Sequence, residues 1–127
     1  MKIGFKLVCA GAVLALAIGS ARADELLGSY IARISDADRF ASDGYRLDTA
    51  AQMVRQDRAN WHKFGSGDAE DQHDPWFEST ASRARFEKML NRSGAIDQRT
   101  RRAIVNGEPV VRVNVYRNSV EVELLGR

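Results

Sequence analysis

Residues 47–76 read LDTAAQMVRQDRANWHKFGSGDAEDQHDPW and contain both histidines and both tryptophans of the chain. In the first part of this stretch apolar residues recur every three or four positions, which predicts an amphipathic helix. Thr49 and Gln52 have the spacing of a capping box, in which each side chain bonds a free backbone N–H at the helix start. The glycine- and acid-rich residues 65–76 predict a loop. We expect the other elements to pack around this helix and any binding site to lie in this stretch.

Asp57 is the one residue that conflicts with the apolar stripe of the expected helix. At about 100° per residue it falls in the middle of that stripe, and carboxylates are almost never buried unless they are paired. Either the stripe opens to a cleft at Asp57, or an arginine meets the carboxylate in the core. The planar guanidinium suits such a buried pair, so the sequence predicts a structural ion pair of Asp57 with Arg83 or Arg85. A functional carboxylate is the alternative.

The helix and the end of the loop also supply the candidate binding residues. These residues combine ionisable and aromatic side chains: Asp57, Arg58, Trp61, His62 and Trp76. The competing interpretation of His62 is a partly exposed histidine beside arginines, since it lies off the centre of the apolar stripe.

The loop is a candidate metal site because calcium prefers carboxylate and carbonyl oxygens. Its spacing does not match an EF-hand. Zinc would require His62, His73 and Asp71 to converge. The candidate metal ligands are Asp68, Glu70, Asp71, His73 and Asp74. The alternative is a solvated acidic loop that binds neither calcium nor zinc, in which case no cofactor is expected.

The N-terminal residues 1–23 have the pattern of a secretory signal peptide. Two lysines precede an apolar run, and Ala21-Arg22-Ala23 matches an A-x-A cleavage site. The run is shorter than the roughly 20 residues that span a bilayer, which argues against the alternative of an uncleaved anchor. We expect cleavage between Ala23 and Asp24, a periplasmic or secreted location, and no transmembrane segment in the mature chain.

Cleavage would change the charge balance of the protein. The chain has 19 basic and 17 acidic residues, and three of the basic residues lie in the expected signal peptide, so the mature chain would carry 16 − 17 = −1. The only cysteine also lies there, so no disulfide is expected. Residues 24–127 are sufficient for a single small domain.

The mature chain predicts an α+β fold with three to four short helices packed on a C-terminal antiparallel β-hairpin. A short helix over 36–42 should turn Phe40 inward, and further helices are expected over about 80–92 and 97–105. Residues 30–34 alternate enough for a third short strand, with a helical turn as the alternative, and 24–28 are expected to be a loose leader. The alternating valines of 111–124 predict the hairpin, with a two-residue turn at Arg117-Asn118 and Asn118 in the left-handed conformation.

Charge is distributed unevenly along the chain. Residues 68–78 hold five acids and no lysine or arginine, whereas residues 83–102 hold seven basic residues and two acids. These faces either neutralise one another or form a bipolar surface that docks an envelope protein, lipid or polysaccharide. Nucleic acid is a poor partner, because aromatic residues are not interleaved with the basic run.

No catalytic motif stands out in the sequence. It contains no G-x-S-x-G elbow, no H-E-x-x-H pair, no glycine-rich phosphate loop and no cysteine outside the expected signal peptide. We therefore expect a small exported interaction or binding module, with its site around residues 47–76. The alternative is a small metal-assisted hydrolase or calcium-binding domain that uses the acidic loop and the two histidines.

Overall fold

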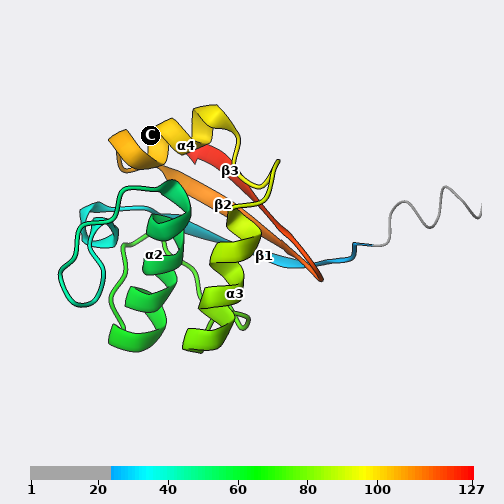
Figure 1. Ribbon diagram of the computed structural model, residues 1–127, viewed down its shortest axis with the longest axis horizontal. Helices are drawn as coiled ribbons and strands as arrows, with labels where there is room; N and C mark the ends of the chain where they lie inside the picture. Colours follow the sequence, from blue (N-terminus) through cyan, green and yellow to red (C-terminus); the bar gives the residue numbers. More distant parts are fainter. Residues whose placement is uncertain (1–23) are drawn as a thin grey trace, which may run out of the picture.

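A three-stranded antiparallel sheet carries helices on one face in the computed structural model, which describes residues 24–127 (Figure 1). The predicted signal peptide, residues 1–23, lies outside the described residues. The elements are β1 (Leu26–Arg33), the 3-10 helix η1 (Asp36–Arg39), α2 (Ala50–Phe64), α3 (Thr80–Leu90), α4 (Gln98–Asn106), β2 (Val110–Tyr116) and β3 (Val120–Gly126). The α+β class with a C-terminal hairpin is confirmed. Within residues 24–127 no helix has both the length and the apolar character to cross a membrane.

The hairpin of β2 and β3 has the predicted register. Val115 pairs with Val120, Val113 with Val122, and Arg112 with Glu123. The valines face the core because successive side chains of a strand alternate between the two faces of a sheet. The turn conformation differs from the prediction, since no described residue other than glycine has a positive φ. Asn118 instead donates its backbone N–H to the carboxylate of Asp24, 2.9 Å away.

β1 is longer than the strand predicted at residues 30–34. It begins at Leu26 and pairs antiparallel with β2, with an irregularity between Leu26 and Gly28. The prediction of a loose leader over 24–28 was therefore wrong. Pairing with β2 provides hydrogen-bond partners for the backbone N–H and C=O groups of this segment. The local sequence pattern did not indicate a strand there.

The segment after β1 forms only a short 3-10 helix where the sequence predicted a helix over 36–42. Asp38 accepts a hydrogen bond from the backbone N–H of Ser35 at 2.9 Å, one half of a capping box at the start of this helix. Phe40 faces outward, contrary to prediction, with 38% of its surface exposed and the guanidinium of Arg46 over its ring. Arg39 takes the buried place instead and donates to the carbonyls of Ile104, Val105 and Gly107 at the end of α4.

α2 begins and ends as its sequence predicted. Thr49 and Gln52 form the capping box, and Gly65 closes the helix at φ 64°, in the left-handed region where a side chain is disfavoured. α2 and α3 pack side by side in front of the sheet, and α4 lies beyond one end of them (Figure 1). The core between helices and sheet contains Val54, Phe86, Leu90 and Ile104 together with the inward valines of the hairpin.

Both edges of the sheet are covered by segments far away in sequence. On β1, Ile31 exchanges hydrogen bonds with Gln72 at 2.8 and 2.9 Å, and the backbone N–H of Arg33 donates to Asp71 at 2.7 Å. On β3, Val122 donates its backbone N–H to Ala95 at 2.8 Å. Covered edges leave fewer unpaired groups that could template pairing with another chain. The acidic loop therefore has a structural role along β1.

Candidate functional site

Arg58 lies at the centre of a buried ionic cluster beneath α2, made of Asp57, Arg58, His62 and Asp74 and called here the Arg58 cluster. Arg58 donates from Nε to Asp57 at 2.8 Å and from Nη1 to Asp74 at 3.0 Å. Its Nη2 lies 2.7 Å from Asp57 Oδ2, an ionic contact without hydrogen-bond geometry. All three side chains are almost fully buried. Two carboxylates thus compensate one buried guanidinium, the condition under which a charge is tolerated away from water.

The arginine that meets Asp57 is its neighbour in sequence, which corrects the predicted pairing with Arg83 or Arg85. Arg83 donates to the backbone carbonyl of Phe77 at 3.0 Å, and Arg85 donates to that of Arg117 at 3.3 Å. Burial raises the pKa of the Asp57 carboxyl, and the positive charge of Arg58 opposes that rise. Helical spacing could not reveal the pair, because adjacent helical residues do not normally face each other.

Asp74 ties the end of the acidic loop to α2. Its Oδ2 lies 2.7 Å from His62 Nε2, and its Oδ1 accepts the backbone N–H groups of Trp76 and Phe77 at 2.9 and 2.8 Å. Burial raises the pKa of this carboxyl, but hydrogen bonds from His62 and Arg58 outweigh burial, and the net shift is downward. Asp74 therefore stays ionised. It caps the turn that sends the chain from the loop toward α3.

A histidine held by a buried aspartate supplies two of the three members of a nucleophile-activating triad. In residues 24–127, however, no serine, threonine or cysteine side chain hydrogen-bonds His62, and its imidazole is nearly buried. The residue as a whole is of intermediate exposure, and it shares Asp74 Oδ2 with Arg58, so His62 lies beside an arginine with the aspartate between them. The contact between His62 and Asp74 joins α2 to the end of the acidic loop and has a structural role.

Aromatic rings enclose the Arg58 guanidinium. Its Cζ lies 4.2 Å from the ring centroid of Tyr30 and 5.4 Å from that of Trp61. Trp61 is only half-buried and its indole N–H donates to His73 at 3.4 Å, so it forms the outer wall of the cluster. Trp76 lies apart from this cluster, over Gly28 of β1, where an added Cβ would come within 2.8 Å of its ring. The five candidate binding residues thus do not line one open cleft.

The carboxylates of Asp71 and Glu70 in the acidic loop accept hydrogen bonds from β1 and from the loop itself. Asp71 accepts backbone N–H groups of Arg33 and Asp68, and Glu70 accepts two hydrogen bonds from the Arg33 guanidinium at 3.0 and 2.6 Å. The His73 side chain is 64% exposed, with its Nε2 3.9 Å from a Glu78 carboxylate oxygen and its ring centroid 5.5 Å from that of His62. Across residues 24–127 no three His, Cys, Asp or Glu side chains are arranged to hold a metal ion. The calcium and zinc hypotheses therefore gain no support from the geometry of this loop.

Asp38 is a buried carboxylate in the 3-10 helix η1. It is 3% exposed and accepts hydrogen bonds from Ser35 and from the Asn60 amide at 2.9 Å each. Burial raises its pKa to about 6, and the negative charges of Asp71 and Asp68 add to that rise. In residues 24–127 no basic side chain pairs with it.

A groove opens between α2, α3 and the 41–47 loop. Its volume is about 390 Å³. We call it the Arg83 groove, and it is lined by Ala41, Ser42, Asp43, Leu47, Gln52, Arg55, Gln56, Ala59, Lys63, Thr80, Arg83 and Glu87. Its position was not predicted from the sequence. The available signal was Arg83, which shares helical spacing with the buried Phe86 and Leu90 and so interrupts the apolar face of α3, as Asp57 does on α2.

Most arginines of the basic run at residues 83–102 have hydrogen-bond partners within the fold. Four of its arginines donate to backbone carbonyls: Arg83, Arg85, Arg92 and Arg101. The exposed Arg99 and Arg102 line a second groove of about 320 Å³ at α4, together with Arg127 and Glu108. Much of the positive charge therefore holds loops and helix ends in place.

Comparisons with protein-family models, with curated protein sequences and with solved structures found no match to this chain. The geometry of the described residues is therefore the basis for the assignment of function.

Proposed function

We propose that the protein is a small exported binding module and that its ligand site is the Arg83 groove. One observation carries the proposal. The ionisable side chains on the loop-facing side of α2 are bonded to one another or to the backbone, whereas the α3-facing side opens into a groove of about 390 Å³. Pockets of roughly 300–1,000 Å³ are typical of small-ligand sites.

The chemistry of the groove supports binding more than catalysis. Its lining combines guanidinium, ammonium, amide, hydroxyl and carboxylate groups with apolar alanine and leucine side chains. Both histidines lie outside this lining, and the buried one is already held by Asp74. General acid–base work at neutral pH most often uses histidine, which the groove does not offer. A binding site of this kind would release its ligand unchanged.

The proposed location follows from residues 1–23, and its test is separate from that of the site. The full chain would be expressed in a bacterial host, and the periplasmic fraction and medium analysed by intact-mass measurement. We expect a product that begins at Asp24. A full-length product retained in the membrane or cytoplasm would contradict export.

The binding site is tested by placing a photo-crosslinking residue at Ala59, which lines the groove, or at Ala69, which is exposed in the acidic loop. Both variants would be irradiated with envelope extract of the source organism. We expect a discrete adduct at position 59 and none at position 69, with the recovered ligand unaltered in mass. An adduct only at position 69 would move the site to the acidic loop, and a chemically altered ligand would favour an enzyme.

A further inference from the structure

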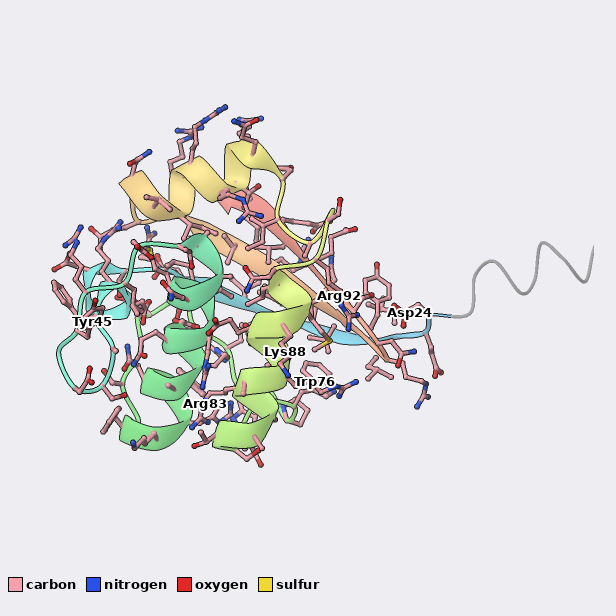
Figure 2. The ribbon with its side chains drawn as sticks, in the orientation of Figure 1. Asp24, Tyr45, Trp76, Arg83, Lys88 and Arg92 are labelled. Atoms are coloured by element: carbon pink, nitrogen blue, oxygen red, sulfur yellow. The ribbon has the colours of Figure 1, made fainter. Side chains whose placement is uncertain are left out.

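Arg83 is the most unusual residue of the groove. It comes from α3 and lies between α3 and α2 (Figure 2), with 5% of its surface exposed. Its described hydrogen bonds go to the carbonyl of Phe77 at 3.0 Å and to the hydroxyl of Thr80 at 3.4 Å. A guanidinium has five N–H donors, so these two neutral acceptors leave donor capacity unused.

No carboxylate of residues 24–127 lies within 4.0 Å of the Arg83 nitrogens. Glu87, the acid on the same wall, is bonded to Arg55 at 3.0 Å. Arg55 also adds to the positive potential at Arg83, and together with burial it lowers the pKa of the Arg83 guanidinium. A buried charge is normally paired, and an isolated one is costly. The groove therefore holds a cation that the described protein leaves without an opposite charge.

Lys63 also lines the groove. Its ammonium group, like the Arg83 guanidinium, has no carboxylate partner among the described residues. Against these groups stands Asp43 in the 41–47 loop, whose carboxylate accepts a backbone N–H of Tyr45. The groove is thus positive on balance, since Arg55 and Glu87 neutralise each other.

We propose that the Arg83 groove binds a compact oxyanion, a carboxylate or phosphate group carried on a small polar ligand, with Arg83 as its principal partner. This inference rests on the proposed function and names the chemical class of its ligand. The planar fork of arginine donates two parallel hydrogen bonds to either kind of anion. The amides of Gln52 and Gln56 and the hydroxyl of Thr80 suit the polar body of such a ligand.

The test is a titration of the isotope-labelled full chain at constant ionic strength, followed by NMR. The probes are inorganic phosphate, glucuronate and, as the neutral control, glucose. We expect saturable shifts of resonances from α2 and α3 with at least one anion and none with glucose. Saturation by phosphate alone would assign a phosphate group, and saturation by glucuronate alone would assign a carboxylate.

Three variants give the residue-level test. Arg83→Met should weaken anion binding about tenfold or more, because a charge-assisted hydrogen bond is lost. Arg85→Met is the matched control, since Arg85 lies on the same helix, outside the groove lining, and should bind the anion as the wild type does. If Arg83→Met does not fold, Lys63→Met on the groove lining should still weaken binding in a folded protein.

Two results would overturn the inference. One is the absence of saturable shifts with either anion, and the other is equal affinity in wild type, Arg83→Met and Lys63→Met. A crosslink at Ala59 together with either result would leave the binding module standing and remove only its anionic ligand. Failure of the crosslink and of all three probes would instead reject the groove as the site.

Discussion

Two arginines are buried at α2: Arg58, on the loop-facing side of this helix, and Arg83, which approaches the opposite side from α3. Arg58 meets the carboxylates of Asp57 and Asp74 and packs on the ring of Tyr30, so its charge is compensated within the fold. Within residues 24–127, Arg83 hydrogen-bonds a carbonyl and a hydroxyl but no carboxylate, and it lines a groove of about 390 Å³. The two arginines have the same side chain and similar burial but different partners. The difference indicates that Arg58 stabilises the fold. Arg83 keeps N–H donors that its described hydrogen bonds do not use, which is the basis for proposing a ligand there.

The largest effect is expected in the Arg58 cluster. Arg58→Met alone leaves the buried carboxylates of Asp57 and Asp74 without their cation and should lower the free energy of unfolding by roughly 3–5 kcal/mol. Asp57→Ala should lower it less, because Asp74 still pairs with Arg58. The double variant should lose less than the sum of the two, because the pair is removed together. Denaturant unfolding of all four proteins measures this coupling. Additive losses would show that the contact between Asp57 and Arg58 contributes no coupling energy.

Asp38 is the acidic counterpart of Arg83, a buried charge without a partner of opposite sign among the described residues. Its pKa of about 6 lies above the ordinary value of 3.8, so between about pH 4 and 6 the folded protein keeps a proton that the unfolded chain has lost. This contribution to stability is present below that window and is lost as pH rises through it, by roughly 2–3 kcal/mol. Asp38→Asn removes the titration. The difference between the unfolding free energies of wild type and variant should change across the window, and parallel curves would contradict the assignment.

Arg83→Met should change stability much less than Arg58→Met. The variant loses two hydrogen bonds to neutral acceptors but also removes an uncompensated buried charge, so we expect a change within about 1 kcal/mol in either direction. Urea midpoints of the two methionine variants give the comparison directly. A loss as large as that of Arg58→Met would mean that Arg83 is also a structural residue and that the contrast between the two arginines is wrong.

The smallest effect is expected at the cross-strand pair of Arg112 and Glu123. Their side chains are 41% and 44% exposed and their charged atoms lie 3.3 Å apart. Exposed ion pairs contribute little, so Glu123→Gln should lower the free energy of unfolding by less than about 0.5 kcal/mol. The same denaturation assay checks this value. A loss close to that of Asp57→Ala would show that burial does not explain the strength of the Arg58 cluster.

Elements whose pattern is local were predictable from the sequence. The alternating valines fixed the hairpin and its register, because the two-residue period of a strand leaves one arrangement that buries all of them. The Thr49 capping box and Gly65 set the bounds of α2, and Asp97 starts α4, because a cap acts within a few residues of its helix. The sequence also identified Asp57 as anomalous, since a carboxylate in an apolar stripe conflicts with burial.

Contacts between distant segments depended on the tertiary structure. Leu26 to Ser29 joined β1 only because β2 offers partners for their backbone groups, and the acidic loop covers the edge of that strand through Asp71 and Gln72. The spacing along one helix does not reveal that Asp57 pairs with Arg58. Nor does it reveal that Arg83 packs near α2 with no carboxylate of residues 24–127 within ion-pair distance. These outcomes depend on how α2, α3 and the loop are placed in space. A sequence determines the period of each element, whereas the partner of a buried charge is decided by the packing between elements.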